Sequence, residues 1–248
     1  MRKSKINKAI ADLHQAIKDT TGRTDALADR KFHRHDEYLS YGLTASKFRK
    51  LLKEYRSRFL GLSLQERMDL ASCLLQEHIG ELGHVGLHIL TLSVKDIGPK
   101  HFLYLDSLPE HFRSWSHVDH IALGVIQPLL QQFRKETLEL LEEWSRSPIR
   151  WKRRACIVTF TRKAAKSGEF TEEVIRLCEN LIWDEEDIVQ KGVGWALKDN
   201  LRSEPERILP YIKDLRRRGV PSTITLYAIR DLKGTKRQEV LEVRKGSG

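Results

Sequence analysis

The segment Ser114-Trp-Ser-His-Val-Asp-His-Ile-Ala-Leu-Gly-Val-Ile126 has the apolar spacing of an amphipathic helix. Within it, Trp115 and Asp119 are four residues apart, so their side chains lie on one helix face, one turn from each other. A carboxylate fixed beside an aromatic ring can stabilise a developing cation while the ring contacts the group that carries the charge. A structural interpretation stays open, in which Trp115 is a core residue and Asp119 complements the helix dipole.

Helical spacing continues on both sides of this segment, and almost no stretch alternates apolar and polar residues as a strand would. The capping box Ser63-Leu-Gln-Glu66 predicts the start of one helix, and Ser203-Glu-Pro-Glu206 predicts the start of another. Residues 20–35 are polar, and we expect a loop there. Prolines and glycines divide the rest of the chain into short helical segments joined by turns.

Similar segments around Trp115, Arg154 and Trp195 recur at roughly 40-residue intervals, which is the period of HEAT-type helical repeats. No repeated consensus accompanies them, so this prediction rests on spacing and helix pairing. We expect an all-α, HEAT-like helical-repeat solenoid (an α-α superhelix) with a concave basic face. The expected organisation is a single domain over residues 1–248, with N-terminal helices in 1–60, core repeats in 61–232 and a short C-terminal tail in 233–248.

Charge and cysteine content narrow the function classes. Lys and Arg number 44 against 34 Asp and Glu, which gives a net charge of +10 and favours a polyanionic partner, nucleic acid before an anionic membrane. The three cysteines are far apart and lack CxxC spacing, which argues against a disulfide framework or a zinc site. Without an apolar run of spanning length or a signal peptide, the sequence predicts a soluble cytoplasmic protein that is nucleoid-associated when bound to DNA.

Two further segments place aromatic and charged residues in helices. In Trp151-Lys-Arg-Arg-Ala155 a tryptophan and three cations begin an otherwise apolar helix. In Asp187-Ile-Val-Gln-Lys-Gly-Val-Gly-Trp-Ala-Leu-Lys198 the side chains of Lys191 and Trp195 share a face. Gly192 and Gly194 each cost about 1 kcal/mol against Ala inside a helix, so we expect something to approach that backbone closely.

These segments together resemble the AlkD-type DNA alkylation repair glycosylases. The resemblance is carried by Ser114-Trp-Ser-His-Val-Asp119, Trp151-Lys-Arg-Arg-Ala155 and Val189-Gln-Lys-Gly-Val-Gly-Trp-Ala-Leu197, in that order and spacing. Tyr41-Gly-Leu-Thr-Ala-Ser-Lys-Phe-Arg49 is similar to the family's glycine-containing turn and basic helix. The resemblance extends from about Tyr38 to Leu232.

The resemblance implies a monofunctional, monomeric enzyme that excises positively charged N3- or N7-alkylated purines from duplex DNA, with no metal or cofactor. It places the catalytic carboxylate on Asp119, the two site tryptophans on Trp115 and Trp195, and the functional arginine on Arg154, with Arg153 the less favoured neighbour. The sequence departs from the family where Ser116 replaces an acidic or bulkier residue, Gly192 replaces Ala and Lys198 replaces Arg. These departures leave the preferred lesion open.

The chemistry suits these residue types, because a cationic purine is already a good leaving group. Asp119 would stabilise the oxocarbenium-like sugar and orient the attacking water. Trp115 and Trp195 would contact the deoxyribose and its backbone, and Arg154 would bind a flanking phosphate. No lysine stands out as a Schiff-base nucleophile.

Several cations are candidates for DNA contacts, although each also suits a solvated face. They are Arg153, Lys191, Lys47, Arg49, Lys50, Arg216, Arg217 and Arg218. Metal binding is not predicted, because His33 and His35 do not share a helix face and His84 and His88 lack the glutamate of a zincin motif. The remaining large aromatics Trp144 and Trp183 have core-like spacing.

Two other functions remain open. A non-catalytic HEAT-like paralogue would recognise DNA structure without excising a base, and a helical-repeat scaffold would bind an acidic protein. The joint presence of Trp115, Asp119, Arg154 and Trp195 favours the enzyme. Tolerance of bulky adducts, base flipping and the role of residues 20–35 stay undecided.

Overall fold

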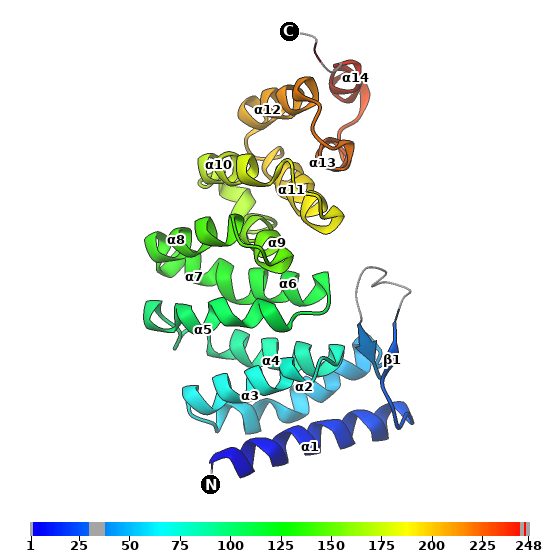
Figure 1. Ribbon diagram of the computed structural model, residues 1–248, viewed down its shortest axis with the longest axis vertical. Coiled ribbons are helices and arrows are strands. Elements are labelled where there is room, and N and C mark those ends of the chain that lie inside the picture. The colour runs from blue at the N-terminus through cyan, green and yellow to red at the C-terminus, as the bar shows by residue number, and fades with distance from the viewer. Residues whose placement is uncertain (1, 30–37, 244–245, 247–248) are drawn as a thin grey trace. The chain divides into compact units, whose positions relative to one another are not determined.

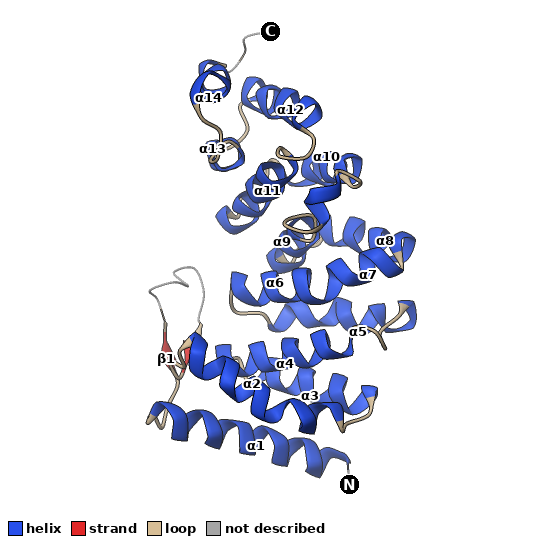
Figure 2. Cartoon of the chain, turned by 180° about the vertical axis from the view of Figure 1, so that it is seen from behind, coloured by secondary structure: helices blue, strands red, loops and turns tan. Residues whose placement is uncertain are grey.

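Helices account for about three quarters of the chain that the computed structural model describes, residues 2–29, 38–243 and 246 (Figures 1 and 2). In these residues the strands are limited to the two-residue antiparallel pair β1 (Leu27–Ala28) and β2 (Leu39–Ser40). The chain consists of two compact units, Met1–Phe133 and Arg134–Gly248.

The first unit contains long N-terminal helices followed by shorter ones. Its helices are α1 (Arg2–Thr21), α2 (Ala45–Leu60), α3 (Leu64–Gln76), α4 (Gly80–Ser93), α5 (Phe102–Ser107), α6 (Trp115–Ile121) and α7 (Gln127–Gln132), with the 3-10 turns η1 (Pro99–His101) and η2 (Leu108–His111) and the π segment η3 (Ala122–Ile126). Because α1 continues to Thr21, the expected loop begins after that residue. His33 and His35 lie outside the described residues.

Local sequence explains how α3 and α4 pair. The predicted capping box is confirmed, since the Ser63 hydroxyl accepts a hydrogen bond from the Glu66 N–H and the Glu66 carboxylate accepts one from the Ser63 N–H. A Cβ at Gly86 would lie 2.8 Å from the Ala71 carbonyl oxygen, so glycine is what allows α4 to approach α3 this closely. The two helices lie side by side in the first unit (Figure 1).

The predicted helix over Ser114–Ile126 has an irregular second half. Regular α6 ends at Ile121, the π segment η3 follows, and α7 continues from Gln127. Gly124 in η3 lies against α4, where a Cβ would be 2.8 Å from the Thr91 hydroxyl oxygen. Short π segments occur frequently at functional sites, and this one directly follows the turn that carries Asp119.

The second unit is a series of longer helices. They are α8 (Arg134–Ser145), α9 (Arg150–Val158), the 3-10 turn η4 (Ala164–Ser167), α10 (Thr171–Leu181), α11 (Asp187–Asn200), α12 (Pro205–Arg218), α13 (Ser222–Ala228) and α14 (Gly234–Glu242). Helix α11 packs on α9 and on α13 (Figure 1).

The glycines of α11 mark these two helix contacts. A Cβ at Gly194 would lie 2.6 Å from the Tyr227 Cβ and 2.8 Å from the Ile224 carbonyl oxygen, so α13 is what approaches the backbone here. Gly192 instead faces α9, with the nearest atoms 3.3 Å and 3.5 Å from a built Cβ. The close approach that the two glycines predict therefore comes from helices of the same unit.

Some sequence predictions about the second unit are wrong. Helix α12 begins at Pro205 behind Glu204, and the Ser203 hydroxyl donates to the Ala165 carbonyl at 2.6 Å rather than forming a second capping box. Residues 233–248, predicted as a tail, include helix α14, which buries Val240. Trp183 is 57% exposed and is not a core residue.

The core prediction for Trp144 is confirmed. Trp144 is 1% exposed and belongs to the core. In the described residues Cys73, Cys156 and Cys178 form no disulfide, and the last two are buried. Across the described part of the chain, no helix has both the length and the apolar character needed to cross a membrane.

Candidate functional site

Helix α6 carries the indole and carboxylate of the first candidate motif. Ser114 is the extended N-cap residue, and its hydroxyl accepts a hydrogen bond from the Ser116 N–H at 3.0 Å. This cap begins the helix at Trp115, so Asp119 follows one turn later on the same face. Both side chains are half-buried. The first unit thus presents an aromatic ring and a carboxylate together.

A cluster of histidines packs beside α6. The Nδ1 atoms of His84 from α4 and His120 from α6 are 3.2 Å apart, and the two rings stack. The other His84 nitrogen is 3.1 Å from the Ser116 hydroxyl, and the His117 ring meets His84 edge-on at 4.6 Å. Because one Nδ1 must donate and the other must accept, at least one of these two imidazoles is neutral.

Burial favours the neutral imidazole of His120 and of His88. It lowers the pKa of His120 to about 4, and the neighbouring His88 adds a smaller repulsion. Burial, together with the positive charge of Arg56, also lowers the pKa of His88. His120 therefore brings no positive charge to its sequence neighbour Asp119 at pH 7. Among the described residues, no group of three or more His, Cys, Asp or Glu side chains has an arrangement that would hold a metal ion.

The two adjacent arginines of α9 are held in different ways. Arg154 is 5% exposed, and its Nη1 donates to the Ile188 carbonyl of α11 at 2.7 Å. Arg153 forms a two-point ion pair with Asp184, with Nε–Oδ2 at 2.5 Å and Nη2–Oδ1 at 3.2 Å. The Arg153 Nη1 also donates to the carbonyls of Ser147 and Pro148. A DNA contact by Arg153 would require these bonds to break, which favours a structural role for it.

Helix α11 places Trp195 and Lys191 one turn apart. The Trp195 Nε1 donates to Asp199 Oδ2 at 2.9 Å, and the Arg162 guanidinium lies 5.3 Å from the centre of the indole ring. Lys191 is exposed and pairs with Asp187 at 2.7 Å. Sequence reasoning missed both Asp199 and Arg162. The Trp195–Asp199 spacing repeats that of Trp115 and Asp119, and this was the available signal.

The remaining predicted DNA contacts differ in how much of their charge is already paired. Lys47 donates to the Thr20 carbonyl, Lys50 lies 3.8 Å from Glu54, and Arg218 binds both oxygens of Glu179 at 2.8 Å. Arg216 donates to the Leu241 carbonyl. Arg49 and Arg217 are exposed, and their guanidinium groups make no hydrogen bond or ion pair with any residue the structure describes.

Comparisons with solved structures show what fold these sites belong to. The chain is similar to a predicted DNA alkylation repair enzyme from Enterococcus faecalis, with a TM-score of 0.71 and 14% identity over 80% of this chain and 90% of the other. It is also similar to AlkD2 from Streptococcus mutans, with a TM-score of 0.57 and 18% identity over 96% of each chain. A third likeness, to smu.31 from Streptococcus mutans UA159, has a TM-score of 0.53 and 19% identity over 82% and 95%. These likenesses confirm the predicted all-α helical-repeat fold.

The sequence comparison extends over most of the chain. The model of the family described as DNA alkylation repair enzyme matches residues 13–232, which confirms the resemblance that the three motifs predicted. No curated protein matches the chain. The protein therefore belongs to the DNA alkylation repair enzyme family, and it is an enzyme of DNA repair whose partner is DNA.

Proposed function

We propose that the protein is a monofunctional DNA glycosylase that hydrolyses the N-glycosidic bond of positively charged N3- or N7-alkylated purines in duplex DNA. The observation that supports this most directly is the half-buried pair of Trp115 and Asp119 on one turn of α6, in a family of DNA alkylation repair enzymes. In this proposal the protein works as a monomer in the cytoplasm and is associated with the nucleoid when it is bound to DNA.

The reaction needs charge stabilisation more than proton transfer to the base. As the C1′–N bond breaks, the bonding electrons move to the cationic purine, which leaves as a neutral base, and the sugar gains positive charge. The Asp119 carboxylate stabilises that charge, more strongly where surrounding protein excludes water. Water then adds to C1′ and loses a proton to Asp119 or to solvent, so the products are the free base and an abasic site.

The aromatic and basic residues bind the strand in this proposal. Trp115 offers a π face to the cationic sugar next to Asp119. In the second unit, the hydrogen bond from the indole N–H to Asp199 fixes the orientation of the Trp195 ring. In this orientation the ring contacts the DNA backbone in the proposal. Arg154, whose Nη1 donates to the Ile188 carbonyl, is the proposed ligand of a flanking phosphate.

The test is the identity of the products. Purified protein is incubated with a duplex that carries one 7-methylguanine, and the free base and the strand are analysed separately. The proposal predicts release of free 7-methylguanine and an abasic strand that stays uncleaved until alkali is added. Immediate strand cleavage would contradict the monofunctional assignment. DNA binding without release of this base or of other cationic purines would favour the non-catalytic DNA-binding paralogue.

A further inference from the structure

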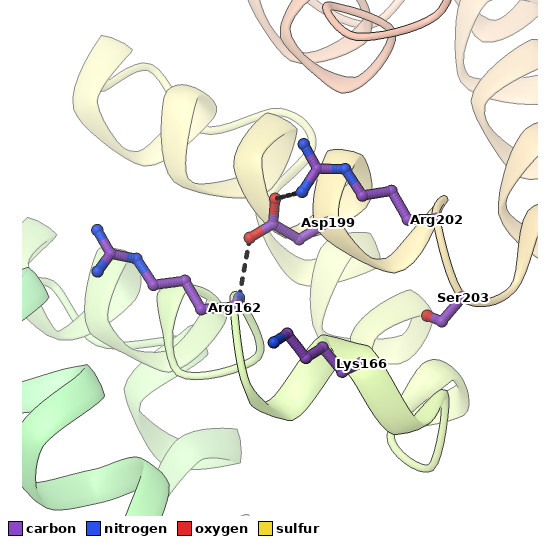
Figure 3. Close-up of a pocket in the computed structure, with 5 residues that line it drawn as sticks. All are labelled: Arg162, Lys166, Asp199, Arg202 and Ser203. Atoms are coloured by element: carbon purple, nitrogen blue, oxygen red, sulfur yellow. Dashed lines mark hydrogen bonds and ion pairs between the residues drawn. The ribbon is translucent and has the colours of Figure 1, made fainter.

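A pocket of the second unit lies beside the Trp195 motif and was not among the predicted sites. It has a volume of about 460 Å³ and is lined by Arg162, Lys166, Asp199, Arg202 and Ser203 (Figure 3). The residues come from the turn between α9 and α10 and from the C-terminal end of α11. Three of the five are cations and one is an acid.

Hydrogen bonds fix the two walls of this pocket against each other. The Asn200 side-chain amide donates to the Phe160 carbonyl at 2.9 Å, and the Ser203 hydroxyl donates to the Ala165 carbonyl at 2.6 Å. The Arg162 N–H donates to Asp199 Oδ2 at 2.8 Å. Arg162 has a φ of 51°, a left-handed conformation that non-glycine residues rarely adopt and that persists only where neighbours enforce it.

The carboxylate of Asp199 is already occupied by protein donors. Its Oδ2 accepts from both the Arg162 N–H and the Trp195 indole N–H, and its Oδ1 lies 3.2 Å from the Lys198 ammonium. Arg202 lies 3.9 Å from the same Oδ1 and also pairs with Asp231. The acid therefore organises the pocket and contributes little net negative charge to an incoming ligand.

Two cations of the pocket remain available. The Lys166 ammonium and the Arg162 guanidinium are exposed, and neither pairs with a carboxylate anywhere in the described chain. Figure 3 shows the Arg162 side chain extending from its turn away from Asp199, and the Lys166 side chain extending from the helical turn that follows. The Arg162 guanidinium also lies near the Trp195 ring, so the cationic pocket and the aromatic side chain adjoin.

We propose that this pocket binds a backbone phosphate of DNA next to the nucleotide that Trp195 contacts, with Arg162 and Lys166 as the phosphate ligands. The inference rests on the proposed function insofar as it assumes that Trp195 contacts DNA. A phosphodiester suits the site, because guanidinium and ammonium groups supply charge-assisted donors to phosphate oxygens. Asp199 is a positioning residue here, since one of its oxygens holds both the Arg162 backbone and the Trp195 ring.

The experiment measures how DNA affinity depends on salt. The variants Arg162→Gln and Lys166→Gln, singly and together, remove the two charges. Lys163→Gln is the matched control, because Lys163 is exposed in the same turn and does not line the pocket. Binding to an undamaged duplex is followed by fluorescence anisotropy over a range of salt concentrations. Each pocket variant should make the negative slope of log K against log salt shallower by about 0.9, and the double variant by about twice that.

The outcomes separate this proposal from the proposed function. A shallower salt slope in the pocket variants, with the Lys163→Gln slope unchanged, supports the pocket as a DNA phosphate site. If the wild type binds DNA and all variants have the same salt slope as the wild type, the pocket proposal is overturned and the glycosylase proposal stays intact. Binding of inorganic phosphate that these variants abolish, without any change in DNA affinity, also overturns it. Absence of DNA binding by the wild type would contradict both proposals.

Discussion

Two Trp-Asp pairs with the same spacing occupy different surroundings. Asp199 is 8% exposed and binds the indole N–H of its own Trp195, whereas Asp119 is half-buried on the turn after Trp115. Spacing alone predicts only that each pair shares a helix face. The motif therefore located the candidate carboxylate, but the positioning role of Asp199 depends on contacts from Arg162, which lies 37 residues earlier in the chain.

The adjacent pair Arg153 and Arg154 shows a similar limit. Only the family resemblance favoured Arg154 over Arg153. The two residues are both arginines and have nearly the same sequence neighbours, so local sequence does not distinguish them. The structure separates them through Asp184, which pairs with Arg153 from a different segment. Tertiary packing decides which arginine forms an ion pair with the acid, and the sequence of the helix does not show which one it is.

Replacing Asp199 tests its positioning role. Asp199→Ala leaves the Trp195 indole N–H and the Arg162 backbone N–H without their acceptor. We expect the free energy of unfolding, measured with urea, to fall by roughly 2 kcal/mol, since a buried donor without a partner costs about 1–3 kcal/mol. The control Asp214→Ala removes only an exposed pair with Arg218 and should cost about 1 kcal/mol or less. Equal effects of the two changes would contradict the positioning role.

At the scale of elements, caps and packing set how well helices could be predicted. The Ser63 box is correct because its serine and glutamate bond each other. The Ser203 box failed because its hydroxyl bonds to the preceding turn of another segment. Helix α14 was missed because it is mostly polar and buries only Val240, so its sequence lacks the apolar stripe on which the prediction relied.

The glycines of α11 give a test of helix packing. Gly194→Ala would put a Cβ 2.6 Å from Tyr227 Cβ and 2.8 Å from a backbone oxygen, so we expect a loss of about 1–3 kcal/mol in unfolding free energy. Gly192→Ala meets its nearest neighbours at 3.3 Å and 3.5 Å and gains about 1 kcal/mol of helix propensity. It should be close to neutral. Thermal unfolding of both variants checks this, and a strongly stabilised Gly194→Ala would be inconsistent with the packing.

The histidines between α4 and α6 predict a pH dependence. Because burial lowers the pKa of His120 from 6.5 to about 4, the unfolded chain binds the proton more tightly than the folded chain. The stabilisation from neutral His120 is complete above pH 6.5 and is lost as the pH falls toward 4, by at most about 3 kcal/mol. His84 and His88 are the other histidines that face this group.

Urea unfolding at several pH values measures this effect. Between pH 7 and pH 5 the wild type should lose more stability than His120→Gln, whose side chain cannot titrate. The amide retains a donor and an acceptor for His84, so the difference between the two curves reports the proton rather than the lost contact. Parallel curves for the two proteins would show that the buried imidazole does not govern acid stability.

At the scale of the whole molecule, fold and family were the most predictable features. The all-α helical-repeat class follows from the helical spacing of apolar residues. The fold is shared with structures of only 14–19% identity, because many different apolar residues can fill the same buried helix faces. The net charge of +10 agrees with a DNA partner. Charge alone could not show which cations are able to contact DNA. Arg218 and Arg153 form ion pairs with acids of the same chain, whereas Arg162 and Lys166, which no motif marked, are available to bind phosphate.

In the proposed reaction the Asp119 carboxylate provides the electrostatic stabilisation for base release. The measurement is the single-turnover rate of 7-methylguanine release from a duplex, for wild type, Asp119→Asn and the exposed-acid control Glu110→Gln. We expect a fall of about 10²–10³-fold for Asp119→Asn with unchanged DNA affinity, and a wild-type rate for Glu110→Gln. An Asp119→Asn protein that releases the base at the wild-type rate would contradict the proposed role of Asp119.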